Sequence, residues 1–229
     1  MRLLPAAVVV AAAAPQVPSA VSLVVNVRPA GPRALLAELA SLGDVQALYD
    51  EARRRQEAGL LPGGVEVVPA ARTVLFDGLD DVAAFAAQLR AWAPRPSARR
   101  AGSRAEIPVV YDGEDLAFVA DCWGVRTDEV GDAHTSLLHE VAFIGFSPGF
   151  AYLTGLPDAW RVPRLERPRP AVPAGAVGLA DEFTGIYPRR SPGGWRLIGR
   201  CEVAMWDPAR VPPSLLSPGD VVRFVAVRR

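Results

Sequence analysis

Glycine and proline limit what this chain can fold into more than any other feature, because both interrupt regular helices. The 229 residues include 20 glycines and 22 prolines, together 42 residues. This content predicts many turns and short strands, and it excludes a helical bundle. Half of the residues are hydrophobic, which is enough for a sizeable core. The length suits one large domain or two small ones.

The charged residues exclude several kinds of function. The 25 basic residues balance the 25 acidic ones, and all basic residues are arginines. Because the isoelectric point is near 6.8, a general nucleic-acid binder is not expected. Without lysine, the chain cannot supply a P-loop lysine, a Schiff base or a biotin attachment site. Cys122 and Cys201 lie far apart in the sequence, so with His134 and His139 they lack the spacing of a zinc finger, and two cysteines are too few for a disulfide framework. We therefore expect no metal site.

The N-terminal 22 residues need a separate interpretation. They contain an apolar stretch that is too short to span a membrane. It resembles either a weak signal peptide or the translation of sequence upstream of the true start. We favour the second interpretation, and expect residues 1–22 to be a disordered or mis-started extension of a cytoplasmic protein without membrane contact.

Residues 23–93 predict a small α+β domain. Asp44 is expected to cap a helix that ends near Arg55, and Asp80 or Asp81 to cap a second helix that ends near Trp92. β-branched and apolar segments predict strands at 22–27, 35–39, 65–68 and 73–76. Two helices should therefore cover one face of a sheet.

A polar linker at residues 94–105 predicts a domain boundary, and residues 106–229 have the pattern of a β-barrel. We expect Thr127 to cap one short helix over residues 128–137. Short strands are predicted at 107–111, 116–120, 141–146, 196–201, 203–206 and 221–227.

The segment from Gly145 to Gly149 matches the G-x-S-x-G pattern of serine hydrolases. The residue after Ser147 is Pro148, which has no N–H group for an oxyanion hole. No histidine follows Ser147 in the sequence. Serine hydrolase chemistry is therefore not expected.

Residues 145–195 hold the densest cluster of candidate ligand-binding features. Four segments rich in glycine, proline and aromatic residues occur here, and we interpret them as loops that place N–H groups and flat rings around a small ligand. The alternative is that they are ordinary barrel turns. Arginine pairs naturally with carboxylates and phosphates, so Arg164 and Arg169 predict an anionic ligand. His134 is either a structural residue or an acid–base catalyst near the rim of this site.

The same segments resemble a known family. Its motifs are Gly-Phe-x-Pro-Gly-Phe-x-Tyr-Leu from Gly145, Val-Pro-Ala-Gly from Val172, Thr-Gly-Ile-Tyr-Pro from Thr184 and Ser-Pro-Gly-Gly-Trp from Ser191. They are similar to those of the B-type subunits of 5-oxoprolinase, a family also called allophanate hydrolase subunit 1, the carboxyltransferase C/D domain and the Kip-type inhibitor of a histidine kinase. The chain departs from the family pattern at His139, where a tyrosine is usual.

The resemblance implies a cyclophilin-like barrel at residues 106–229. It also implies an enzyme subunit that works only with homologues of the A-type and C-type 5-oxoprolinase subunits, in an ATP-dependent complex that opens the lactam of 5-oxoproline to glutamate. Two alternatives are half of a biotin-dependent urea or allophanate-type carboxyltransferase, and a protein that inhibits a sensor histidine kinase.

The family motifs identify His134 as the candidate catalytic residue. The candidate residues for binding a small carboxylate substrate are Pro148, Gly149, Phe150, Tyr152, Arg164, Arg169, Gly175, Gly178, Thr184, Gly185, Tyr187, Ser191, Gly193, Gly194 and Trp195.

Overall fold

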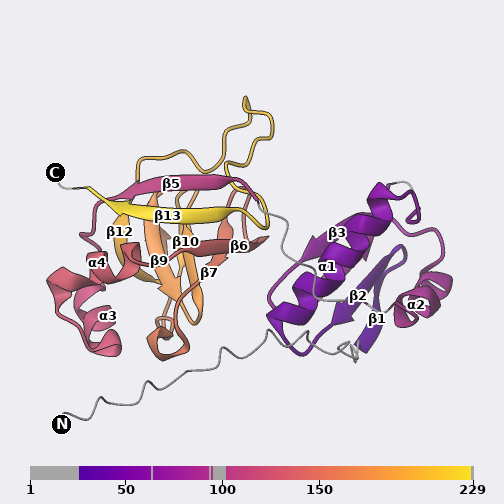
Figure 1. The fold of residues 1–229 in the computed structure, drawn as a ribbon, viewed down its shortest axis with the longest axis horizontal. Helices are drawn as coiled ribbons and strands as arrows, with labels where there is room; N and C mark the ends of the chain where they lie inside the picture. The colour runs from indigo at the N-terminus through magenta and orange to yellow at the C-terminus, as the bar shows by residue number, and fades with distance from the viewer. Residues whose placement is uncertain (1–25, 63, 93, 95–101, 228–229) are drawn as a thin grey trace, which may run out of the picture.

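The computed structural model describes residues 26–62, 64–92, 94 and 102–227, and these form two domains that lie side by side (Figure 1). The predicted extension at residues 1–22 and most of the predicted linker lie outside the described residues. Within the described residues, no helix is both long enough and apolar enough to cross a membrane.

The N-terminal domain is a four-stranded antiparallel sheet with two helices. Its elements are β1 (Asn26–Gly31), β2 (Ala34–Glu38), α1 (Leu42–Glu57), β3 (Glu66–Pro69), β4 (Thr73–Asp77) and α2 (Val82–Arg90). The strand order is β1-β2-β4-β3. The helices bury Leu48 and Phe85 against Phe76 of the sheet, and the Phe76 and Phe85 ring centroids are 5.1 Å apart.

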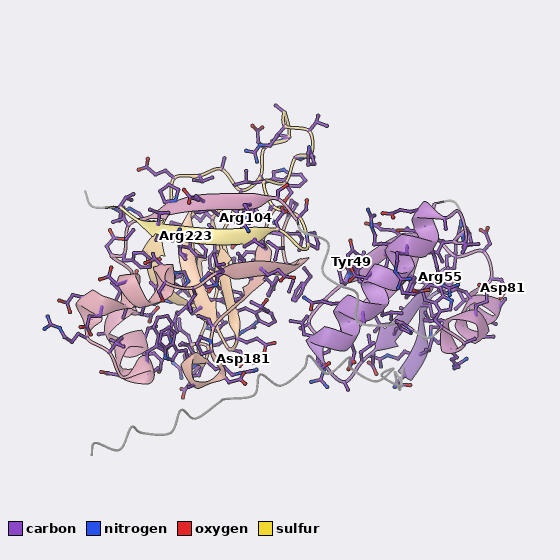
Figure 2. All side chains as sticks on the ribbon, in the orientation of Figure 1. Tyr49, Arg55, Asp81, Arg104, Asp181 and Arg223 are labelled. Atoms are coloured by element: carbon purple, nitrogen blue, oxygen red, sulfur yellow. The ribbon has the colours of Figure 1, made fainter. Side chains whose placement is uncertain are left out.

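Side-chain caps fix where these two helices begin. The Ser41 hydroxyl accepts the backbone N–H of Asp44 at 3.1 Å, so Ser41 is the N-cap of α1. The prediction that Asp44 caps this helix is wrong; its carboxylate lies in the first turn, where it favours the helix dipole. Asp81 caps α2, as predicted, and accepts the N–H of Ala84 at 2.9 Å (Figure 2).

The C-terminal domain is a barrel with short helices at one side (Figure 1). The first part of the domain contains β5 (Arg104–Val109), α3 (Leu116–Trp123), η1 (Thr127–Glu129), α4 (Val130–Thr135), β6 (His139–Ile144), β7 (Ala151–Thr154) and η2 (Asp158–Trp160). The second part contains β8 (Arg169–Val172), β9 (Ala176–Ala180), β10 (Phe183–Ile186), β11 (Ser191–Gly193), β12 (Arg196–Arg200) and β13 (Val221–Ala226).

Seven of these strands form the barrel wall. Their order is β12-β9-β10-β7-β6-β13-β5, while β8 and β11 pair separately as a two-stranded ribbon. Val110 and Arg200 exchange two backbone hydrogen bonds of 2.9 Å, which join the β5 end of the sheet to the β12 end. The predicted fold class, α+β with a C-terminal barrel, is therefore confirmed.

Several predicted elements of this domain are wrong. Residues 116–120 begin helix α3 rather than a strand, because Val119, Ala120 and Trp123 share one buried helical face. Gly124 ends that helix in the left-handed conformation at φ 68°. Residues 203–206 make only one bridge, between Trp206 and Ser214, and the helix predicted at 128–137 is split into η1 and α4.

The glycine- and proline-rich segments differ most from their prediction. Every residue of β9 and β10 is buried, so these two segments are barrel wall and not loops. Strands of four or five residues are too short to show a clear alternation, and glycines inside them look like turn signals. Their glycines instead make room for side chains that come from elsewhere in the chain.

Candidate functional site

Six aromatic side chains form a continuous layer on the outer side of the barrel wall. The aromatic layer consists of Phe143, Phe150, Tyr152, Phe183, Tyr187 and Trp195. The Phe150 ring lies 5.1–5.2 Å from those of Tyr152, Tyr187 and Trp195, measured between centroids, mostly edge to face. The layer is thus one packed unit that contains four of the predicted binding residues.

Strand β10 separates this layer from the barrel interior. Phe183 packs in the layer, while Ile186 packs in the interior core, as expected for side chains that alternate between the faces of a strand. Gly185 faces the layer, and it pairs with Gly178 of the neighbouring strand β9. These two glycines form a flat surface on which the Trp195 side chain lies.

Close contacts explain why these positions are glycine. A Cβ at Gly185 would lie 2.8 Å from Cζ3 of Trp195, and one at Gly178 would lie 3.1 Å from Cβ of Trp195. A Cβ at Gly193 would overlap the Tyr187 hydroxyl. Predicted binding residues Gly178, Gly185 and Gly193 therefore position Trp195 and Tyr187 by their lack of a side chain.

Arg164 lies at the outer edge of the aromatic layer. Its guanidinium is 5.9 Å from the centroid of the Trp195 ring. Burial raises the pKa of Tyr152 and of Tyr187, and the positive charge of Arg164 opposes both shifts. The charge of the guanidinium is therefore close enough to affect the pKa of both phenol groups. It has no carboxylate partner among the described residues, so its N–H groups remain available to an anion.

Arg169, by contrast, is already neutralised. Its guanidinium donates to Asp115 at 2.8 Å, to Glu114 at 3.2 Å and to the backbone carbonyl of Trp195 at 3.2 Å. Asp115 is nearly fully buried and also accepts the backbone N–H of Leu197 at 2.7 Å. Arg169 therefore holds the chain around Trp195 in place.

His134 lies inside the barrel rather than at the rim of the aromatic layer. Its side chain is fully buried. Nδ1 lies 2.7 Å from the Tyr111 hydroxyl, and Nε2 lies 3.2 Å from the Thr184 hydroxyl, on the inner face of β10. Burial lowers the pKa of His134 well below its usual value, and the neighbouring His139 adds to this shift. His134 and Thr184 therefore lie together inside the barrel, on the side of β10 opposite to Trp195.

His139 is the second buried histidine. Its ring centroid is 4.6 Å from that of His134 and 5.1 Å from that of Phe224. Neither ring nitrogen has a hydrogen-bond partner among the described residues. Burial lowers its pKa to about 4, and the nearby backbone of His134 opposes this shift only in part. Both imidazoles are therefore neutral at pH 7.

The remaining predicted residues surround the layer. Pro148 and Gly149 form a turn after β6, where a Cβ on Gly149 would contact Met205 and Trp206 at 2.9 Å. Gly175 donates its N–H to the Tyr187 carbonyl at 2.8 Å.

Besides Arg169 and Gly193, two further predicted residues lie in the ribbon or at its end. The Ser191 hydroxyl on β11 is buried and has no hydrogen-bond partner among the described residues. Gly194 accepts the N–H of Leu165 at 2.8 Å, which brings the loop of Arg164 to this end of the ribbon.

Sequence reasoning misses several residues that shape this region. Asp115 is one of them, because the residues after it resemble a strand, although an acidic residue before a helix is a known N-cap signal. Phe143 and Phe183 belong to the layer but lie outside the loops that were expected to bind ligand. Leu42 and Ala71 of the N-terminal domain also pack against the layer. No local sequence pattern indicates contacts between residues so far apart in the sequence.

No group of three histidine, cysteine or acidic side chains in the described part of the chain is arranged to hold a metal ion.

Solved structures with a similar fold give the first comparison. The crystal structure of the Kluyveromyces lactis urea amidolyase matches 93% of this chain with a TM-score of 0.70, at 21% identity and over 15% of that longer chain. The solved protein TTHA0988 matches 86% of this chain with a TM-score of 0.70, at 37% identity. The match spans 40% of the TTHA0988 chain. Both matches show that solved proteins share the fold of this chain.

Sequence comparisons then identify the family. Residues 25–216 match the family described as carboxyltransferase domain, subdomain C and D. The chain belongs to this family. It is 44% identical over 172 residues to the Escherichia coli O157:H7 protein named as the B-type subunit of 5-oxoprolinase, a match that covers 72% of this chain and 79% of the relative.

Proposed function

We propose that this chain is a subunit of a 5-oxoprolinase complex, and that Arg164 and the half-buried Tyr152, at the edge of the aromatic layer, bind the carboxylate-bearing substrate. The names of its relatives support the first part. One observation carries the second part: Arg164 lies over Trp195 without a carboxylate partner among the described residues, whereas Arg161, Arg169 and Arg196 are all paired with acidic side chains.

The chemistry of 5-oxoproline suits such a site. The molecule carries one carboxylate on a compact, uncharged lactam ring. A guanidinium can donate two parallel hydrogen bonds to a carboxylate, and its position over Trp195 limits the side-chain entropy lost on binding. Tyr152 is only half-buried, so its ring and hydroxyl can contact the lactam.

We assign His134 a positioning role in place of the predicted acid–base role. Both of its ring nitrogens are within hydrogen-bond distance of Tyr111 or Thr184, and its side chain is fully buried. By holding Thr184, it fixes strand β10, whose opposite face carries Phe183 and Gly185 beneath Trp195.

ATP fits poorly on the described residues of this chain. Phosphates commonly bind at helix N-termini, where backbone N–H groups and the helix dipole attract negative charge. Each α-helix of the described chain has its own acidic side chain there, as the N-cap or in the first turn: Asp44, Asp81, Asp115 and Asp132. Asp44, Asp81 and Asp132 would repel a phosphate, and Asp115 already occupies the arginines beside its helix. We therefore propose that the A-type and C-type homologues hold the nucleotide.

The two alternative functions predict different partners. A carboxyltransferase half would need biotin on another chain, because this one has no lysine. A kinase inhibitor would act without either of the two homologues. The likeness to urea amidolyase supports only the shared fold, so neither alternative is favoured here.

Reconstitution tests the proposal. The chain is mixed with the A-type and C-type homologues, and 5-oxoproline-dependent ATP hydrolysis is measured with each protein omitted in turn. We expect activity only in the complete mixture. Hydrolysis at an unchanged rate without this chain would refute the proposal.

Variants of this chain then locate the site. Arg164→Ala should raise the KM for 5-oxoproline at least tenfold. Arg223→Ala provides the matched control, because Arg223 is exposed on β13 and has no ion pair among the described residues (Figure 2). Equal KM values in the two variants would move substrate binding to another protein of the complex.

A further inference from the structure

The two-stranded ribbon of β8 and β11 has an excess of positive charge. Three nearby arginines are neutralised by acidic side chains: Arg161 by Asp158, Asp181 and Glu182, and the pair Arg169 and Arg196 by Asp115 and Glu114. These pairs use up the acidic side chains around the ribbon almost completely. The remaining arginines therefore determine its charge.

Four exposed arginines flank the ribbon without a carboxylate partner among the described residues. They are Arg164, Arg167, Arg189 and Arg190, and we call them with strands β8 and β11 the basic ribbon. Glu166 is the single acidic residue within the two segments 163–168 and 188–193. The excess is three positive charges at one place in a chain whose formal net charge is zero.

Backbone pairing brings these arginines together. Ser191 pairs with Val172 and Gly193 with Arg169, so Arg189 and Arg190 lie at one end of the ribbon. The bond between Leu165 and Gly194 puts the loop that carries Arg164 and Arg167 at the other end. At about 3.3 Å per strand residue, the two ends are on the order of 10 Å apart.

The ribbon is suited to contacts through its side chains and not to strand addition. Pro170 and Pro192 are exposed in β8 and β11, and proline has no N–H to offer a neighbouring strand. The four arginines are exposed and spread over a distance too large for one small anion. Because the isoelectric point of the whole chain is near 6.8, a nucleic acid is a poorer fit than an acidic protein surface.

We propose that the basic ribbon is the docking surface for an acidic face of another protein of the complex. This inference rests on the proposed function, because it takes the partner to be a further 5-oxoprolinase subunit. Carboxylates of the partner would pair with Arg167, Arg189 and Arg190, whose positive charges repel one another in the free chain, while Arg164 stays with the substrate site. Such complementarity speeds association, and its effect weakens as salt screens the charges.

Charge reversal tests the docking surface. Arg189→Glu together with Arg190→Glu is compared with Arg104→Glu together with Arg223→Glu, a control pair that is also exposed and unpaired but lies on strands β5 and β13 (Figure 2). Association rates with the A-type and C-type homologues are measured by surface plasmon resonance at 50 and 300 mM salt. Circular dichroism checks that each variant is folded.

We expect the ribbon pair to slow association with one partner at least tenfold at 50 mM salt and to flatten its salt dependence. The control pair should stay within twofold of the original chain. Equal effects of the two pairs, or no effect of the ribbon pair, would overturn the inference. So would a ribbon reversal that abolishes binding to single-stranded DNA while partner association is unchanged.

The outcome separates this inference from the proposed function. If the original chain does not associate with either homologue, both are refuted. If it associates and supports 5-oxoproline-dependent ATP hydrolysis, but the ribbon reversal leaves association unchanged, only the docking surface is refuted.

Discussion

Replacing Gly185 with alanine would place a methyl group where the aromatic layer leaves no room. The added Cβ would lie 2.8 Å from Cζ3 of Trp195, 3.1 Å from the Ala151 carbonyl oxygen and 3.1 Å from Cε1 of Phe150. Favourable carbon–carbon contacts are about 3.5–4.0 Å. Because one neighbour is backbone and two are buried rings, the strain has no flexible side chain to absorb it.

The free energy of unfolding should fall by about 2 kcal/mol. Overpacking a core costs about 1–3 kcal/mol, and the crowded surroundings favour the upper part of that range. Alanine restricts the unfolded chain more than glycine does, which offsets roughly 0.4–1 kcal/mol of the destabilisation. Urea unfolding followed by circular dichroism measures the difference.

Gly145→Ala is the matched control. A Cβ there has its nearest neighbour, Cε2 of Tyr152, at an ordinary 3.6 Å. We expect a change within about 0.5 kcal/mol, typical of a substitution without strain. If Gly185→Ala is no more destabilising than this control, the account of the glycine surface beneath Trp195 is refuted.

A double variant tests the cause of the strain. Trp195→Phe removes the part of the indole that the new methyl group would meet. The combined loss in Gly185→Ala with Trp195→Phe should therefore be smaller than the sum of the single losses by about 1 kcal/mol, within the range found for residues in contact. Additive losses would mean that Trp195 is not the residue under strain.

Two further predictions concern buried titratable groups. Because the pKa of His139 is about 4 in the folded chain and ordinarily near 6.5, the unfolded chain binds more protons between these values. His139 should therefore lower the unfolding free energy by about 3 kcal/mol as the pH falls from 6.5 toward 4, and His134, whose pKa is also lowered, should add to this loss. His139→Gln should reduce the loss in urea titrations without abolishing it. Asp115→Asn removes the buried carboxylate that Arg169 and Arg196 share, and should cost about 3 kcal/mol in the same assay, against about 0.5 kcal/mol for exposed Asp112→Asn. Equal losses would contradict the buried network.

The N-terminal domain can be predicted well from sequence because its signals are local. The stripe of Val82, Phe85 and Leu89 has a helical period, and Asp81 precedes it as a cap. Alternating apolar residues likewise predict the strands at 35–39 and 73–76, close to β2 and β4 as observed. Such patterns need only neighbouring residues to be read.

The candidate site can be predicted in part. Aromatic residues such as Tyr152, Tyr187 and Trp195 are correctly grouped, but no sequence pattern indicates that Gly185 lies beneath Trp195. Trp195 lies between β11 and β12, and its contact with Gly185 of β10 depends on the tertiary structure, which no local signal encodes. The buried position of His134 cannot be predicted locally either, since its ring contacts Thr184, fifty residues away in the sequence.

The KM for 5-oxoproline of the reconstituted complex carrying Arg164→Gln tests the central claim most directly. Glutamine keeps most of the side-chain length but has neither the charge nor the paired N–H groups that a carboxylate would use. The account predicts a KM at least tenfold higher than that of the complex with Arg223→Gln, with circular dichroism spectra unchanged. A KM equal to the control would contradict substrate binding by this chain.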